Sequence, residues 1–266
     1  MSLIEILFEK LAFITWDTIG NAFENKISYG EDTITSVNLL ALKNASLPNL
    51  VIEDTRPSES VKGCDFEFWI GTHSIGWCRY AIQAKKITVS SESYKTLSHS
   101  VSGTPQIDIL ESYSSANKAI PLYCLFNYSK YAVRPSITCP LYRNIKELGC
   151  SVTLSSTIRR ALAIRGARNF EWLHNRPETL PWSCLVRCSK FCESWAEELT
   201  GWKYEDAWYK ELPVPLMHLF EKPLEQVEFV DSNLFSRKTP YRPRWVGVID
   251  ISNDEVQFQN HRDINI

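Results

Sequence analysis

The chain has 266 residues, of which 44% are hydrophobic and 23% charged, which suits one large or two small globular domains with a sizeable buried core. Its formal net charge is −2 at pH 7, which excludes a global polycation and restricts any contact with nucleic acid to local basic patches. A membrane span needs about 18 consecutive apolar residues, and the sequence contains no such run. We therefore expect no membrane partner.

The first residues predict an amphipathic helix and not a secretory signal. Glu5, Glu9 and Lys10 interrupt the apolar residues, whereas a signal peptide has a positive start and an unbroken apolar stretch. We therefore expect a cytoplasmic protein. The buried stripe of this helix is expected to contain Leu3, Ile4, Leu7, Leu11 and Ile14.

A second helix is predicted within residues 21–45. Glu31 or Asp32 lies near its start, and Thr33 or Thr35 is the expected cap. Its buried face is expected to contain Leu39, Leu40 and Leu42.

A short strand at 50–53 is followed by two strands that form a hairpin. Residues 65–70 alternate between polar and apolar, residues 71–76 form a turn bounded by glycines, and residues 77–87 form the longer second strand. On this second strand the side chains that share one face are those of Arg79, Ala81, Gln83 and Lys85.

The next elements complete an α/β core. Residues 90–99 predict a short helix, residues 104–119 a clearer one, and residues 120–128 a strand that is apolar on both faces and therefore central. We place a core domain at 1–130 and an accessory α+β region, packed on that core, at 131–266.

The accessory region contains a predicted helix at 156–173 and a predicted strand near 241–252. The helix carries a cluster of arginines that suits contact with the phosphates of nucleic acid, although a solvated helix face explains the same pattern equally well. These candidate nucleic-acid-binding residues are Arg159, Arg160, Arg165 and Arg168.

The eight cysteines favour small buried thiols in a reducing compartment. Cys184, Cys188 and Cys192 are four residues apart and would share one helical face. Their spacing is not a usual zinc pattern, so a helix buried on its cysteine face is the favoured interpretation over a metal site.

The hairpin carries an unusual set of polar residues. Gln83 and Lys85 point the same way on one strand, and Asp65 can lie across from them on the other. A carboxylate and an amide oxygen are hard ligands that suit Mg²⁺, and a nearby ammonium can orient water and offset charge during hydrolysis of a phosphodiester. The simpler alternative is an ion pair between Asp65 and Lys85 at the end of a sheet.

Asp65 and the later Gln83-Ala84-Lys85, with "QIDIL" and "PLYCLFN" after them, resemble the PD-(D/E)XK superfamily of restriction-endonuclease-like nucleases. The sequence is most similar to the Mrr-like branch, in which Gln replaces the second acid, and to an uncharacterised bacterial family of this superfamily. Cys64 stands where that family usually has Pro. The resemblance covers residues 20 to 130, and it implies a mixed sheet flanked by helices.

The resemblance also implies a metal-dependent endonuclease that acts on nucleic acid, with DNA favoured, and a role in anti-phage defence. Asp65, Gln83 and Glu31 would hold Mg²⁺ or Mn²⁺, and Lys85 would act on the water. Glu59 is a second acidic candidate, and Gln106 could approach the site. The alternative is a catalytically inactive module that binds nucleic acid or assembles a complex; a homo-oligomer or a defence-system partner protein is left open.

Overall fold

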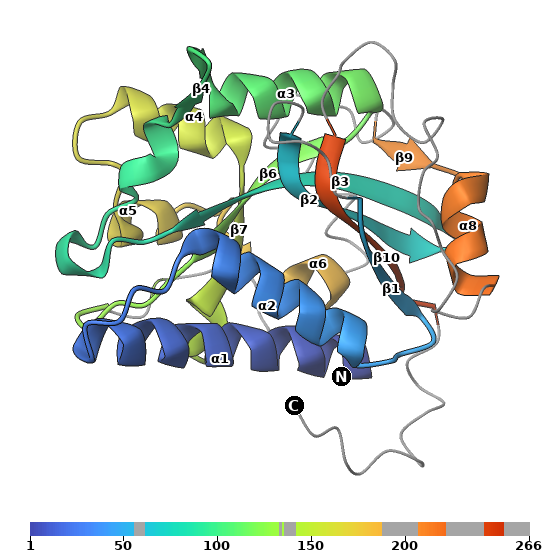
Figure 1. The fold of residues 1–266 in the computed structure, drawn as a ribbon, viewed down its shortest axis with the longest axis horizontal. Coiled ribbons are helices and arrows are strands. Elements are labelled where there is room, and N and C mark those ends of the chain that lie inside the picture. The colour runs from blue at the N-terminus through green and yellow to red at the C-terminus, as the bar shows by residue number, and fades with distance from the viewer. Residues whose placement is uncertain (56–61, 133–134, 136–141, 188–206, 222–241, 253–266) are drawn as a thin grey trace.

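The computed structural model describes residues 1–55, 62–132, 135, 142–187, 207–221 and 242–252. It contains a mixed eight-stranded sheet flanked by helices, which confirms the predicted α/β class (Figure 1). The strand order is β1-β10-β2-β3-β6-β7-β8, and β9 pairs with β3. These strands are β1 Leu50–Asp54, β2 Lys62–Thr72, β3 Gly76–Lys86, β6 Ile120–Phe126, β7 Cys150–Leu154, β8 Leu180–Pro181, β9 Trp208–Tyr209 and β10 Arg242–Asp250.

The sheet combines both strand directions. β10 pairs in parallel with β2, and β3 pairs in parallel with β6, whereas the remaining pairs are antiparallel. β6 lies between β3 and β7 and is buried along its whole length, as expected for a strand that is apolar on both faces. A separate two-stranded ladder joins β4 Ser100–Val101 to β5 Thr104–Pro105.

Helices cover both faces of the sheet. One core packs α1, α2 and α6 against the sheet, and a second packs α3, α4 and α5 against its other face. In Figure 1, α1 and α2 lie below the sheet and α3 and α4 above it. The helices are α1 Leu3–Glu24, α2 Glu31–Asn44, α3 Gln106–Asn117, α4 Ser155–Ala163, α5 Phe170–His174, α6 Cys184–Arg187 and α8 Val214–Glu221.

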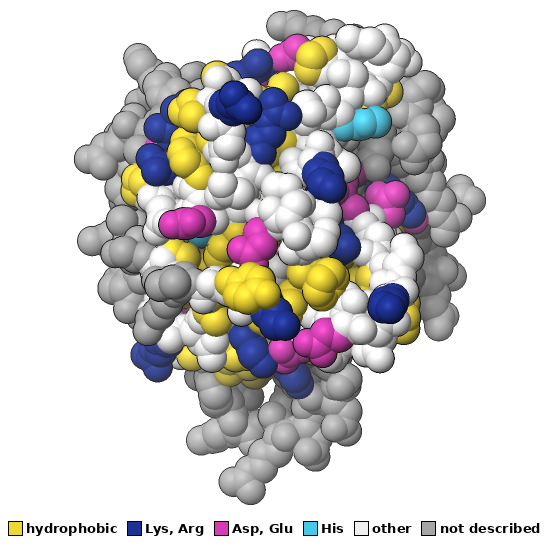
Figure 2. All heavy atoms as spheres, turned by 90° about the vertical axis from the view of Figure 1, so that its left-hand side faces the viewer, with side chains coloured by type: hydrophobic (Ala, Val, Ile, Leu, Met, Phe, Trp, Pro, Cys, Tyr) yellow, Lys and Arg dark blue, Asp and Glu magenta, His cyan; other side chains and the backbone are white. Residues whose placement is uncertain are grey.

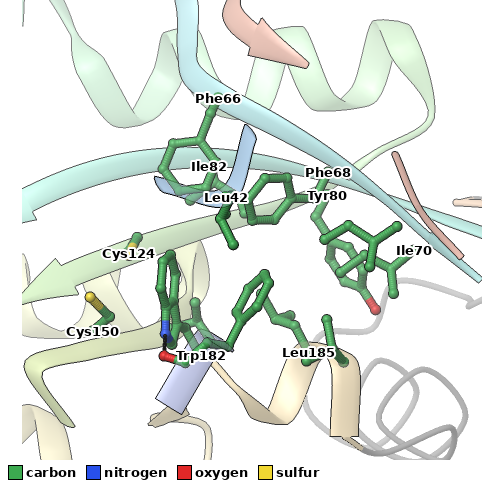
Figure 3. Packing of buried hydrophobic residues seen from close by; sticks show 14 of the residues in the cluster. Leu42, Phe66, Phe68, Ile70, Tyr80, Ile82, Cys124, Cys150, Trp182 and Leu185 are labelled. Atoms are coloured by element: carbon green, nitrogen blue, oxygen red, sulfur yellow. Dashed lines mark hydrogen bonds between the residues drawn. The ribbon is translucent and has the colours of Figure 1, made fainter. Parts of the chain in front are cut away.

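The first core is rich in aromatic side chains. Figure 3 shows Phe66 and Phe68 of β2 on the side of the sheet that faces Trp182 and Leu185. The indole Nε1 of Trp182 donates to the backbone oxygen of Phe8 at 2.7 Å, so the polar atom of this buried ring is satisfied.

The α1 helix begins with a capping box between Ser2 and Glu5. Most of its predicted stripe is buried, but Ile14 is 38% exposed, so that assignment was wrong. The buried stripe continues instead through Thr15, Trp16 and Ile19. Burial recurs every four residues along α1, which exceeds the period of 3.6, so the buried face shifts around the helix axis and leaves Ile14 outside it.

The α2 helix begins at Glu31 after an N-cap glycine, Gly30, so neither predicted threonine cap is used. Thr33 lies inside the helix, and the Thr35 hydroxyl donates back to the Glu31 backbone oxygen at 3.0 Å. Leu40 is 51% exposed, which corrects its predicted place in the buried face.

The predicted C-terminal strand is confirmed as β10, which lies between β1 and β2. The two regions expected on either side of residue 130 therefore share one sheet. The earlier region contributes β1, β2, β3 and β6, and the later region contributes β7, β8 and β10. A long-range pairing of this kind has no local signature in the sequence.

Two predicted helices are broken into shorter elements. The stretch 156–173 contains α4 and α5, separated by a loop in which Gly166 has a φ of 83°. The stretch 90–99 forms two 3-10 turns, at Val89–Ser91 and Lys95–Ser98, with Glu92 at a φ of 46° after the first.

The structure describes one of the three cysteines that were expected to share a helical face. Cys184 is buried in the short helix α6, whereas Cys188 and Cys192 lie outside the described residues. The structure also gives no helix, within the ranges described, with the length and apolar character needed to cross a bilayer.

His174 is fully buried at the end of α5. Its Nδ1 lies 2.9 Å from the Phe170 backbone oxygen and its Nε2 lies 2.8 Å from the Ser151 hydroxyl, which suits a neutral ring that donates at Nδ1 and accepts at Nε2. Burial lowers the pKa of His174 to about 4, and the bond to Phe170 opposes this.

We predict that acidification destabilises the fold through His174. The unfolded chain binds a proton near pH 6.5 and the folded chain only near pH 4, so stability is lost as the pH falls through this window. Between pH 7 and pH 5 the loss from this group should be roughly 2 kcal/mol. Urea unfolding of His174→Gln should show a weaker pH dependence than the wild type, whereas a change at exposed His73 to Gln should keep it. Identical pH dependence in all three proteins would contradict this role.

Candidate active site

Asp65 and Gln83 come together because β2 and β3 pair in antiparallel register. Phe66 lies opposite Ile82, so the next position of the ladder places Asp65 across from Gln83 on the same face. The Gln83 Nε2 donates a hydrogen bond to Asp65 Oδ2, which also accepts from the backbone nitrogen of Ala84 at 2.8 Å. Asp65 and Gln83 are only 5% and 2% exposed.

Lys85 lies two residues beyond Gln83 on β3, so it points to the same face. Glu31, the first residue of α2, reaches it from outside the sheet. One Glu31 oxygen lies 3.1 Å from Lys85 Nζ, and the other accepts from the backbone nitrogen of Lys86 at 2.9 Å. The start of α2 therefore fixes the ammonium group in a position where it is 3% exposed.

The electrostatics of Glu31 reflect this crowded setting. Burial raises the pKa of the Glu31 carboxyl, Lys85 lowers it, and the Asp65 carboxylate raises it again. The pKa of the Lys86 side chain is lowered by burial, against the effect of Glu31. Because the Asp65 carboxylate disfavours the negative charge of Glu31, a cation between them would relieve this repulsion.

The four side chains open into one cavity of about 610 Å³. Its other walls come from the start of α3 and from the segment around β4, whose lining residues include Thr96, His99 and Ser102. Neither Thr96 nor His99 was predicted for this site. They lie in a stretch without clear periodicity, so only the tertiary structure brings them to the cavity.

Gln106, the first residue of α3, lines the same cavity. Its side-chain Oε1 is buried and has no hydrogen-bond partner among the described residues. Buried acceptors in folded proteins usually have a hydrogen-bond partner. A donor or a cation that enters the cavity would provide this partner for Gln106 Oε1.

A buried ionic network lies on the same face of the hairpin. The Arg79 guanidinium forms an ion pair with Glu67 at 3.0 Å and donates to the Asn117 backbone oxygen at 2.9 Å. Glu67 also accepts from the Trp69 indole at 2.7 Å and from the Tyr113 hydroxyl at 2.6 Å. This network ties β2 and β3 to α3, and it was not predicted from the sequence although Glu67 and Arg79 lie on the polar face of their strands.

The structure thus brings Asp65, Gln83, Lys85 and Glu31 together and adds Gln106 to the same cavity. Glu59, the second acidic candidate, lies outside the described residues.

The four candidate arginines do not line this cavity. Arg159 is bound by Asp108 and Glu111, and Arg160 is bound by Glu178. Carboxylates of the protein itself therefore compensate these two charges. Arg165 and Arg168 lie further along, in the loop between α4 and α5.

The donor set fits a hard cation that keeps part of its water shell. Within the described ranges, no group of three or more His, Cys, Asp or Glu side chains could hold a metal. Mg²⁺, however, is commonly bound through one or two carboxylates, with water and substrate oxygens completing its octahedron. Asp65 and Glu31 supply two carboxylates, and Gln83 supplies an amide oxygen if the amide turns its Oε1 inward in place of Nε2.

Comparison with known proteins gives a family and no activity. A family model described as a family of unknown function, DUF6615, matches residues 4–254. The chain belongs to this family. No curated protein and no solved structure gives a significant match.

The buried pair of Glu67 and Arg79 yields a stability prediction. Glu67→Gln should lower the free energy of unfolding by about 3–5 kcal/mol, because it leaves a buried guanidinium without its counter-charge. The double variant Glu67→Gln/Arg79→Met should recover much of this loss, since no buried charge then stays unpaired. Denaturant unfolding of the wild type, both single variants and the double variant measures the coupling. Additive losses would show that the two side chains do not stabilise each other.

Proposed function

We propose that this protein is a metal-dependent endonuclease that hydrolyses phosphodiester bonds of nucleic acid, with DNA as the favoured substrate. The observation that carries the proposal is the convergence of Asp65, Gln83, Lys85 and Glu31 in one cavity, from two strands and one helix. This convergence agrees with the resemblance to PD-(D/E)XK nucleases, which implies a metal site at these same residues.

Asp65 and the Gln83 carbonyl would hold Mg²⁺ or Mn²⁺, and Glu31 would bind the ion directly or through water. When bound, such an ion polarises a phosphoryl oxygen and lowers the pKa of water. The protein fixes the backbone of these ligands through the β2–β3 ladder and through the start of α2, and the Gln83 amide would turn its Oε1 toward the ion.

Lys85 would orient the attacking water and offset the negative charge that develops on the phosphate. Its ammonium is held by Glu31 at 3.1 Å in a largely buried position. A preorganised charge in such a site acts more strongly than the same charge in bulk water.

The proposal includes a cytoplasmic setting. The five described cysteines are buried, which agrees with a reducing cytoplasm. A role in anti-phage defence, and assembly with a second copy or with a defence-system protein, rest on the resemblance alone.

A catalytically inactive module is the second candidate, and one observation favours it. The polar groups of the site are already paired inside the protein, Asp65 with Gln83 and Ala84 and Lys85 with Glu31. The same side chains could therefore serve as a structural network in a module that only binds nucleic acid or assembles a complex.

Lys85→Met should abolish cleavage of DNA in the presence of Mg²⁺ or Mn²⁺. Methionine suits this test because Lys85 is buried, so truncation to alanine would leave a cavity and weaken the fold. Lys86→Met is the matched control, since its side chain points to the other face of the strand, and it should retain cleavage. Gel-based cleavage assays with melting curves of each variant measure both effects. Full activity in a folded Lys85→Met protein would remove Lys85 from the mechanism.

Gln83→Glu should tighten Mn²⁺ binding by about tenfold, because a third carboxylate adds negative charge to the donor set. Without metal this variant should melt at a lower temperature than the wild type, since two carboxylates then face each other. Adding Asp65→Asn should erase the gained affinity, because both residues bind one ion. Calorimetry of the two single variants and the double variant tests this. Strictly additive changes would mean that the two side chains do not share a metal.

A further inference from the structure

A second cavity lies between the end of α4 and the turn that follows β3. It has a volume of about 660 Å³, and its walls include Ser91, Ser93, Arg165 and Arg168. None of the residues lining it is acidic. The carboxylate of Glu92, between the two serines, accepts a hydrogen bond from Ser129 and does not line the cavity. The cavity therefore combines positive charge with hydroxyl groups.

The two arginines of this cavity differ from the two that precede them. Arg159 is occupied by its acidic partners, as described above. Arg165 is exposed and has neither a hydrogen bond nor an ion pair within the described part of the chain. Arg168 is half-buried and donates to the backbone oxygen of Leu162 at 3.3 Å, and no described carboxylate pairs with it. The charge of this pair is thus available to an anion from outside.

One segment forms part of both cavities. Ser91 and Ser93 line the second cavity, and Thr96 and His99 line the candidate active site. The backbone of this segment is fixed to the arginine loop, because the Tyr94 nitrogen donates to the Arg168 oxygen at 2.8 Å. Ser93 and Thr96 are three residues apart, so their Cα atoms are separated by at most about 10 Å.

Figure 2 faces the side of the molecule on which α4, α5 and β4 lie in Figure 1, and Lys and Arg side chains gather in the upper part of that face. A nucleic-acid strand advances about 3.4 Å per nucleotide along a duplex axis, so about 10 Å corresponds to roughly three nucleotides.

We propose that the cavity of Arg165 and Arg168 binds a backbone phosphate of the substrate strand, a few nucleotides from the bond that is cut. This inference rests on the proposed function, and it adds the substrate class: the protein favours a polynucleotide that extends beyond the active site over a nucleotide or dinucleotide. Arg165 and Arg168 position the strand and take no part in the chemistry, since phosphate contacts fix register without reading sequence.

The test measures binding separately from cleavage. The Lys85→Met background without divalent metal is titrated with a labelled DNA strand of about 20 nucleotides over a range of salt concentrations. Arg165→Glu should weaken binding about tenfold and reduce the slope of log K against log salt by about one. Arg159→Ala and Lys10→Glu, an exposed cation on α1, are the controls and should leave binding nearly unchanged.

A second measurement uses the active enzyme with Mn²⁺. Arg165→Glu should raise KM for the long strand and leave kcat unchanged, whereas hydrolysis of a dinucleotide, which is too short to reach the second cavity, should not respond. Equal losses in Arg165→Glu and Lys10→Glu, or equal effects on the long and short substrates, would overturn the inference.

The outcomes also separate this inference from the proposed function. Weaker strand binding in Arg165→Glu, together with a wild type that cuts nothing, would support the phosphate site and contradict the nuclease. Cleavage by the wild type, with strand binding and KM unaffected by Arg165→Glu, would support the nuclease and overturn the phosphate site.

Discussion

The candidate site depends on a single register between β2 and β3. A slip of one residue turns every side chain of a strand to the other face of its sheet, because the side-chain period is two. Such a slip would separate Asp65 from Gln83 and would bring Lys85 toward the apolar core that contains Phe66 and Phe68. The positions of three polar side chains and the packing of a large aromatic core are therefore set by the same pairing.

The buried ion pair of Glu67 and Arg79 strengthens this constraint. Buried ion pairs add little net stability, since removing two charges from water offsets most of their attraction. Their effect against other registers of the β2–β3 ladder is larger, because a shifted ladder would leave both charges buried and unpaired. The α3 helix joins the same network through Tyr113 and carries Gln106 at its start, so the register of the hairpin also sets one wall of the cavity.

The sequence predicted those elements whose signal is local. The hairpin has alternating polarity and glycines at its turn, and β6 is a continuous apolar run, so both follow from short-range patterns. Asp65, Gln83 and Lys85 could be selected together because two strand positions and one hairpin determine their common face. The resemblance alone implies Glu31, and its contact with Lys85 depends on how α2 packs, which no sequence spacing predicts.

The features that escaped prediction depend on distant partners. The different surroundings of Arg159 and Arg165 arise because Asp108 and Glu111 reach one arginine and not the other. The helix at 156–173 was overextended because its apolar residues continue past Gly166, where the chain turns. The nucleic-acid and metal assignments stay predictions, since family membership and geometry alone do not test them.

The place of β10 in the sheet determines when the fold can form. Asn49 donates to the backbone oxygen of Asp250, 201 residues later in the chain, at 2.8 Å. During synthesis, β1 and β2 emerge early, yet the strand that lies between them follows all the other described strands of the sheet. The strand that carries Asp65 therefore lacks its parallel neighbour until residues 242–250 are available, and closing such a large loop is slow. The candidate site is in this way completed only when residues 242–250 have paired with β2, so its geometry depends on the strand of the described sheet that comes last in the sequence.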